Sequence, residues 1–147
     1  MTLIRQFVPT DIGAVTKVVK RSLGETYPPS LYLTVHNLWP EGFMVLEEDG
    51  KVVAFLAAVI PGPKTARVLM LAVIPEHRRK AFGRKLIADL CAVCIMRGVD
   101  TVTLEVRKSN RNAISFYERL GFTVFGEIEK FYSNGEGALK MMKVLQS

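Results

Sequence analysis

The stretch Leu69–Leu90 constrains the fold more than any other part of the chain. It begins with an apolar run that Pro75 cuts off, and residues 86–90 have the spacing of an amphipathic helix. Between these parts lies a short basic segment with small residues at Ala81 and Gly83. The pattern predicts a buried strand, a tight turn and a helix whose first amide groups point at whatever the turn encloses.

The charge of this turn predicts an anionic ligand. Free amides at a helix N-terminus carry partial positive charge, and cationic side chains beside them favour a diphosphate. The cationic residues in or beside the turn are Arg78, Arg79, Lys80, Arg84 and Lys85. The segment alone leaves one alternative open, a solvated basic turn in an ordinary strand-turn-helix unit.

Length and composition indicate one globular domain over residues 1–147. Hydrophobic residues make up 49% and charged residues 23%, as in ordinary soluble proteins. No apolar run approaches the ~20 residues that span a bilayer, and the first residues lack the apolar core of a signal peptide. We therefore expect a cytoplasmic protein without a membrane partner. The net charge of +6 suits an anionic ligand, and contact with nucleic acid or the ribosome is a second explanation.

The two cysteines form a C-x-x-C pair inside an apolar helical pattern. Cys91 and Cys94 are three residues apart and therefore share one helix face. Without a second pair of ligands they are expected to be buried small side chains, so no metal site is predicted.

Periodicity and turn residues predict an α/β protein with the order β-α-α-β-β-β-α-β-α-β-β. This order describes a central mixed, mostly antiparallel sheet with helices on both faces. Thr10 and Ser30 are the expected N-caps of the first two helices. Gly24 and Gly98 are expected to end the first and third helices.

Two motifs resemble the hallmarks of the GNAT superfamily of acetyl-CoA-dependent N-acetyltransferases. The turn is similar to the signature Gln/Arg-x-x-Gly-x-Gly/Ala, with Arg78, Ala81 and Gly83 at the three defined places. Ala81 stands where glycine is usual, and its methyl group narrows the approach to a pyrophosphate. The segment Asn110-x-x-Ala113-x-x-Phe116-Tyr117-x-x-x-Gly121-Phe122 resembles the second hallmark. Together the motifs imply the GNAT fold and acetyl-CoA as co-substrate.

Three further segments resemble the protein Nα-acetyltransferases, both the catalytic-subunit type and the bacterial ribosomal-protein alanine acetyltransferases. They are residues 104–111, the aromatic turn at residues 131–138 and the loop Gly24-Glu25-Thr26-Tyr27. The resemblance implies transfer of acetyl to the free N-terminal α-amine of proteins by direct attack in a ternary complex. It leaves open whether the ribosome or an auxiliary subunit takes part, and it implies no specific nucleic acid.

The resemblance also implies how the co-substrate is held. Backbone groups of Leu71, Ala72 and Val73 would pair with the pantetheine arm, and the Val73 amide would polarise the acetyl carbonyl. Asn110 would hydrogen-bond the pantetheine. The pyrophosphate would be held by the turn residues Arg78, Arg79, Lys80, Ala81, Phe82, Gly83 and Arg84.

Two residues are implied to handle protons. Glu105 would act through water as general base, and Tyr117 would return a proton to the CoA thiolate. The alternatives are a surface carboxylate or an ion pair for Glu105 and helix core for Tyr117. Several relatives have His or Tyr where Arg67 stands, and an arginine there could pair with Glu105 and weaken it as a base. We assign Arg67 no catalytic role.

The resemblance implies that Glu25, Tyr27 and Tyr132 contact the substrate. The alternative is that they are ordinary loop residues. An α-amine has a pKa of ~7.7–8.0 and a lysine ~10.4, so neutralising lysine at pH 7 costs roughly 3 kcal/mol more. A single water-linked carboxylate therefore suits an N-terminal amine better. Acetylation of an internal lysine or a small amine, and a non-catalytic basic binding module, are the competing hypotheses.

Overall fold

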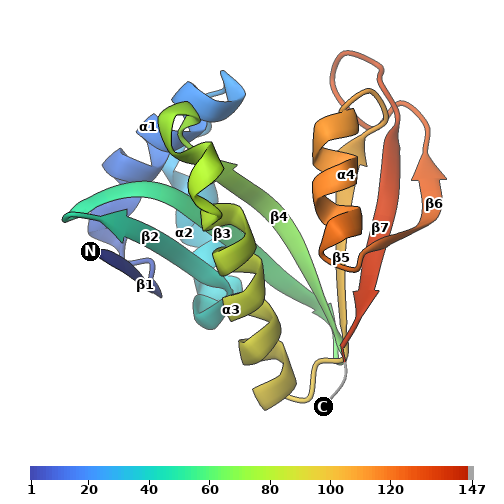
Figure 1. The fold of residues 1–147 in the computed structure, drawn as a ribbon, viewed down its shortest axis with the longest axis horizontal. Helices are drawn as coiled ribbons and strands as arrows, with labels where there is room; N and C mark the ends of the chain where they lie inside the picture. The colour runs from blue at the N-terminus through green and yellow to red at the C-terminus, as the bar shows by residue number, and fades with distance from the viewer. Residues whose placement is uncertain (146–147) are drawn as a thin grey trace.

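The computed structural model describes residues 1–145, which form one seven-stranded sheet and four α-helices (Figure 1). The element order is the predicted one, β-α-α-β-β-β-α-β-α-β-β. The strands are β1 (Thr2–Gln6), β2 (Phe43–Glu48), β3 (Lys51–Gly62), β4 (Thr65–Val73), β5 (Thr101–Arg107), β6 (Thr123–Ile128) and β7 (Ala138–Val144). The helices are α1 (Ile12–Leu23), α2 (Pro29–Leu38), α3 (Phe82–Met96) and α4 (Arg111–Arg119).

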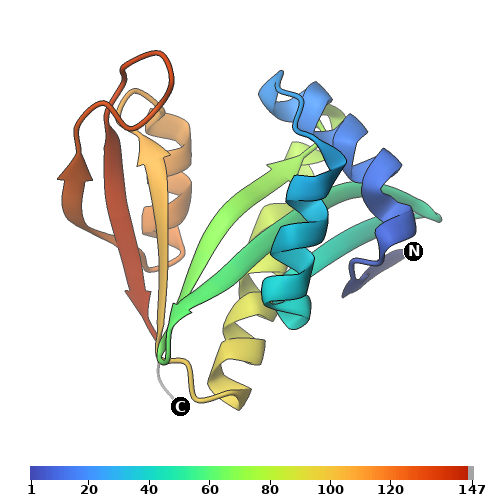
Figure 2. The same ribbon diagram turned by 180° about the vertical axis from the view of Figure 1, so that it is seen from behind.

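The sheet is mixed and mostly antiparallel, which confirms the predicted fold class. Its strand order is β1-β2-β3-β4-β5-β7-β6, and within residues 1–145 only β4 and β5 are parallel neighbours. Helices α1 and α2 cover one face, while α3 and α4 cover the other (Figures 1 and 2). Residues 53–58 of β3 are all buried between these layers, which places the core around the middle of the sheet.

The parallel pair β4 and β5 separates along its length. The two strands pair only where residues 65–67 face residues 101–103. Beyond that point they diverge, and Figure 1 shows the gap widening toward their C-terminal ends. Against β3, Ala57 faces Met70 and Ala58 faces Val68, so Leu69 is an extra, bulged residue that bends β4 away. Residues 68–73 therefore have an unpaired edge on the β5 side.

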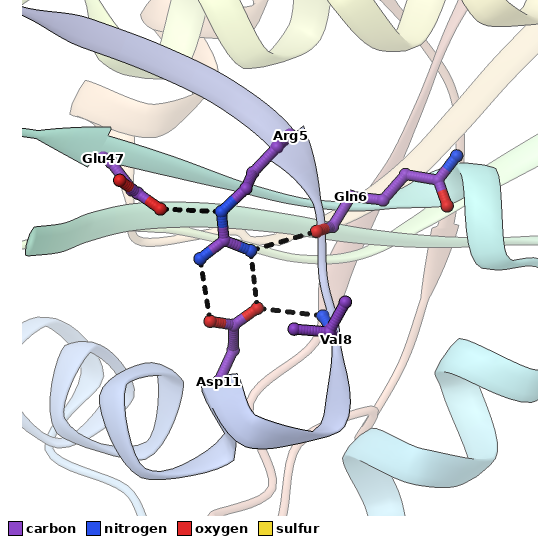
Figure 3. A network of polar contacts seen from close by, with 5 residues as sticks. All are labelled: Arg5, Gln6, Val8, Asp11 and Glu47. Carbon is purple, nitrogen blue, oxygen red and sulfur yellow. Dashed lines mark hydrogen bonds and ion pairs between the residues drawn. The ribbon is translucent and has the colours of Figure 1, made fainter. Parts of the chain in front are cut away.

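The chain enters α1 through a 3₁₀ turn, η1 (Pro9–Asp11), so Thr10 is not the N-cap that the sequence predicted. The carboxylate of Asp11 accepts hydrogen bonds from the Val8 amide at 2.8 Å and from both terminal nitrogens of Arg5 at 2.8 and 2.9 Å. Arg5 also donates from Nε to Glu47 at 2.6 Å (Figure 3). This network joins β1, β2 and the start of α1.

Three other predicted helix boundaries can be compared directly. Helix α2 begins at Pro29, one residue before the predicted cap Ser30, because a proline already has the φ angle of a first helical turn. Gly24 and Gly98 follow the ends of α1 and α3 with φ of +70° and +72°, as the sequence predicts.

The cysteines of α3 are free thiols in the interior. Cys94 is buried and Cys91 is half-buried. Burial raises the pKa of both thiols, to about 12 for Cys94, so they stay protonated at neutral pH and pack as small apolar side chains. Within residues 1–145, no helix has both the length and the apolar character needed to span a membrane.

Candidate functional site

The gap between β4 and β5 contains a pocket of about 330 Å³. Its walls come from the end of α1, the α1–α2 loop, β4, β5, α4 with its N-cap and the β6–β7 loop. Seven of the residues predicted from the sequence line this pocket: Glu25, Tyr27, Leu71, Glu105, Asn110, Tyr117 and Tyr132. The fold thus brings together side chains that are up to about a hundred residues apart in sequence.

The free edge of β4 presents backbone donors to the pocket. The amide of Ile74 donates to the carbonyl of Val53 at 3.0 Å and so points toward β3. Amide directions alternate along a strand, so the amides of Leu71 and Val73 point toward the gap. Ala72, the third residue predicted here, directs its backbone toward β3 and its buried side chain into the core. An extended ligand can pair with Leu71 and Val73 as a neighbouring strand would.

The basic turn lies at the C-terminal end of β4. It consists of a 3₁₀ turn, η3 (Pro75–Lys80), followed by Ala81 with a left-handed φ of +62°, and α3 begins at Phe82. The first amides of α3 have no partner within the helix and are available to an anion. A Cβ at Gly83 would lie 3.2 Å from Cζ of Phe116, so this glycine permits α3 and α4 to approach each other closely.

The cations of the turn have different surroundings. Lys80 pairs with Glu48 at 2.7 Å. The Arg78 side chain turns toward the protein, donating to the carbonyls of Val73 at 3.3 Å and Ser22 at 3.2 Å. In the part of the chain that the structure describes, Arg79 and Arg84 form no ion pair. Both are exposed, so they are free to contact phosphate groups.

Glu105 lies at the floor of the pocket in an ion pair. Arg67 donates from Nε at 3.0 Å and from Nη2 at 2.7 Å, and both bonds go to Oε1 of Glu105. The Glu105 side chain is only 11% exposed. Its other oxygen, Oε2, accepts no hydrogen bond from residues 1–145. The ion pair that the sequence offered as an alternative is therefore present, and it leaves one carboxylate oxygen for another partner.

Tyr117 packs against two aromatic rings, and its phenol remains protonated at neutral pH. Its ring packs edge-on against Phe116 at 5.1 Å and against the buried Phe122 at 5.6 Å between ring centroids. Burial, with a smaller contribution from Tyr132, raises the pKa of Tyr117 to about 12. The phenol is a hydrogen-bond donor at physiological pH.

Asn110 forms the N-cap of α4. Its Oδ1 accepts a hydrogen bond from the Ala113 amide at 3.1 Å, which satisfies one of the free donors of the helix. The side-chain NH₂ of Asn110 keeps its donors for a ligand in the pocket.

The predicted substrate residues occupy two loops at one end of the pocket. Tyr27 donates a hydrogen bond to Glu25, and burial together with this bond raises the pKa of Tyr27 to about 12. Opposite them, Tyr132 lies against the guanidinium of Arg107, whose central carbon is 3.9 Å from the ring centroid. These loops bring a carboxylate and two phenols to the same opening.

The sequence did not identify several lining residues. Leu23 is 47% exposed and lines the pocket, because it is the last residue of α1 before Gly24. Met70 lines it because β4 is free on that side. Arg107 belongs to residues 104–111, one of the segments that resemble the Nα-acetyltransferases. It lies two residues after Glu105, and this spacing indicates that both side chains are on the same face of β5.

Comparison with known proteins gives matches over nearly the whole chain. The sequence pattern of the Acetyltransferase (GNAT) family matches residues 12–122. N-terminal acetyltransferase B complex catalytic subunit NAA20 of Arabidopsis thaliana is 34% identical over 152 residues, covering 99% of this chain and 86% of that protein. The crystal structure of Ard1 from Thermoplasma volcanium has a TM-score of 0.95 at 34% identity, covering 99% of both chains. The ribosomal-protein-S18-alanine N-acetyltransferase from Escherichia coli has a TM-score of 0.86 at 29% identity, covering 100% of this chain and 96% of that one.

Proposed function

The chain belongs to the acetyltransferase (GNAT) family, and we propose that it transfers the acetyl group of acetyl-CoA to the free α-amine at the N-terminus of proteins. One observation carries this proposal. The unpaired edge of β4 directs the Leu71 and Val73 amides toward the gap, and Leu71, Glu105 and Tyr117 line the pocket there. Relatives that match over 99% of the chain are named an N-terminal acetyltransferase and an N-alpha-acetyltransferase, which supports the choice of substrate.

The residues present fit acetyl-CoA. The free amides of Leu71 and Val73 suit the amide-bearing pantetheine arm, and the NH₂ of Asn110 adds a donor beside it. The amides at the start of α3 and the cations Arg79 and Arg84 suit the diphosphate. Acetyl-CoA supplies an activated thioester, whose carbonyl carbon is open to attack by an amine.

Other residues are proposed to assist the attack of the amine on the thioester. Glu105 is placed to accept a proton at Oε2, directly or through one water, because Arg67 occupies only Oε1. The Val73 amide is the donor placed to stabilise the oxyanion at the acetyl carbonyl. In the balanced reaction a C–N bond forms and the C–S bond breaks, while the amine loses a proton and the sulfur gains one. An α-amine depends less than a lysine on Glu105 for its deprotonation, since the pKa of an α-amine is ~2.5 units lower.

We refine the role proposed for Tyr117. A phenol with a pKa of about 12 is a weaker acid than a thiol, whose pKa is ~8.5. Full transfer of the phenol proton to the sulfur is thus unfavourable by roughly 5 kcal/mol at 1.36 kcal/mol per unit. We therefore propose that Tyr117 donates a hydrogen bond to the departing sulfur, whose negative charge it stabilises.

We further propose that Glu25, Tyr27 and Tyr132 contact the first residues of the substrate, because they line one end of the pocket from two loops. Partners beyond the substrate are proposed to be an auxiliary subunit or the ribosome. One relative is named the catalytic subunit of a complex, and another is named for a ribosomal protein. The free thiols of α3 suit the reducing cytoplasm, which is the proposed location.

Two matched variants test the assignment of residues. Glu105→Gln keeps an acceptor for Arg67 but removes the base, so we expect kcat to fall by about 10²-fold or more with acetyl-CoA affinity unchanged. Arg79→Glu reverses a charge at the turn, so we expect acetyl-CoA affinity to fall about tenfold with kcat at saturation retained. Full turnover by Glu105→Gln would show that the base lies elsewhere.

A further inference from the structure

The loop between β6 and β7, residues 129–137, covers the substrate end of the pocket through Tyr132. Its internal structure is a tight turn, in which the Tyr132 amide donates to the Glu136 carbonyl at 3.0 Å and the Gly135 amide to the Tyr132 carbonyl at 2.9 Å. No residue of the loop is fully buried, and Phe131 is 39% exposed. Apolar packing therefore contributes little to holding the loop in place.

One side chain of the sheet contacts three residues of this loop. The guanidinium of Arg107 lies 3.9 Å from the Tyr132 ring centroid, and its Nη1 donates to Glu136 Oε1 at 3.1 Å and to Asn134 Oδ1 at 3.4 Å. Arg107 is the last residue of β5 and is itself only partly exposed. A planar guanidinium can stack on a ring with its face while its edge donates hydrogen bonds.

The same contacts reach the other side of the pocket. Oε2 of Glu136 accepts a hydrogen bond from the Ser109 amide at 3.2 Å. Ser109 directly precedes Asn110, the N-cap of α4. Arg107 and Glu105 are two residues apart on β5, so they lie on the same face of that strand. The loop is thus fastened to the strand and the turn that carry the proposed base and a proposed co-substrate ligand.

We propose that Arg107 is a positioning residue that fastens the β6–β7 loop over the pocket and holds the Tyr132 ring against the first residues of the peptide substrate. The identity of the substrate as a peptide rests on the proposed function, whereas the contact between Arg107 and the loop does not depend on it. Loss of the contact releases a loop that the peptide must then order when it binds. The cost falls on peptide affinity, while the acetyl-CoA turn and Glu105 are not altered.

The test compares two substitutions of Arg107 with a neighbouring control. Arg107→Met removes the charge, and Arg107→Lys keeps the charge but cannot stack and donate in the same way. Lys108→Met is the matched control, because methionine keeps the aliphatic stem that lies beside Gly137 of the loop, while the exposed Nζ that it removes pairs with Glu127 on β6. Hydrogen exchange of residues 129–137 and steady-state kinetics with a free-N-terminus peptide are measured for each protein.

We expect both Arg107 variants to exchange faster in residues 129–137 and to raise the KM for the peptide about tenfold. The KM for acetyl-CoA and kcat should stay within about twofold, and Lys108→Met should behave as the unsubstituted protein. On a Tyr132→Leu background, Arg107→Met should have little further effect on the peptide KM, because the two residues act through one contact.

Three results would overturn the inference. Unchanged exchange in Arg107→Met would show that the loop is held by other contacts, whether or not the protein is active. Faster exchange with an unchanged peptide KM would show that the loop does not hold the substrate. A fall in kcat with equal rises in both KM values would show that Arg107 does not act specifically on peptide binding. If the unsubstituted protein acetylates no peptide, the proposed function fails, and exchange alone still decides whether Arg107 fastens the loop.

Discussion

Replacing Ala81 with glycine should stabilise the protein. Ala81 has a φ of +62°, a left-handed conformation that costs a residue with a Cβ about 1–2 kcal/mol. Glycine avoids that strain but loses about 0.5–1 kcal/mol more conformational freedom on folding. The net gain is about 0.5–1 kcal/mol. At about 2–4 °C per kcal/mol for a chain of this size, Tm should rise by about 1–4 °C.

A second alanine on the following helix gives a matched control of opposite sign. Ala88 is exposed in the interior of α3, where glycine is disfavoured. Ala88→Gly should lower the free energy of unfolding by about 1 kcal/mol. Thermal and urea unfolding followed by circular dichroism measure both variants. If Ala81→Gly lowers stability as Ala88→Gly does, the argument from the left-handed turn is wrong. Because the methyl group also narrows the turn, Ala81→Gly should bind acetyl-CoA at least as tightly as the unsubstituted chain.

Three further substitutions test other parts of the structure. Tyr117→Phe removes a hydrogen bond to a developing charge, so kcat should fall about 10-fold to 100-fold with acetyl-CoA affinity retained, and an unchanged kcat would remove Tyr117 from the reaction. Gly42→Ala places a Cβ 2.1 Å from Cε3 of the buried Trp39, so the free energy of unfolding should fall by about 2–3 kcal/mol. Urea titration measures this change. Asp11→Asn should lower the free energy of unfolding by about 2 kcal/mol at pH 7. Arg5 lowers the pKa of Asp11 below its unfolded value, so this contribution is present above about pH 4 and is lost as pH falls through the folded pKa. The stability difference between Asp11→Asn and the unsubstituted protein should therefore shrink below about pH 4, and a constant difference would contradict it.

The sequence predicted the order of elements because each strand and helix has its own periodicity and its own turn residues. Gly24 and Gly98 are helix ends that only local backbone geometry decides, and both predictions hold. The N-caps were harder to predict from the sequence. Arg5 holds the start of the first helix by donating to Asp11, and it also donates to Glu47, which lies 42 residues away. No local pattern contains such a pairing.

The candidate site shows the same contrast between features with a local sequence pattern and features that depend on long-range contacts. Seven of the residues named from motifs line one pocket, because the motifs follow the strands and helices that the fold brings together. The backbone conformation of Ala81 was not predicted, since alanine is a strong helix former and gives no sign of a left-handed turn. The contact between Arg107 and Tyr132 was also missed, because the two residues come from separate segments and meet only when β5 and β7 pair.

The most direct test of the central claim is acetyl transfer to a panel of peptides, resolved by mass spectrometry. Each peptide carries one internal lysine and has either a free or a chemically blocked N-terminus. The account predicts a single acetyl group on the α-amine of free peptides and none on the blocked ones. Acetylation of the lysine in blocked peptides, or no transfer to any peptide while acetyl-CoA still binds, would contradict it.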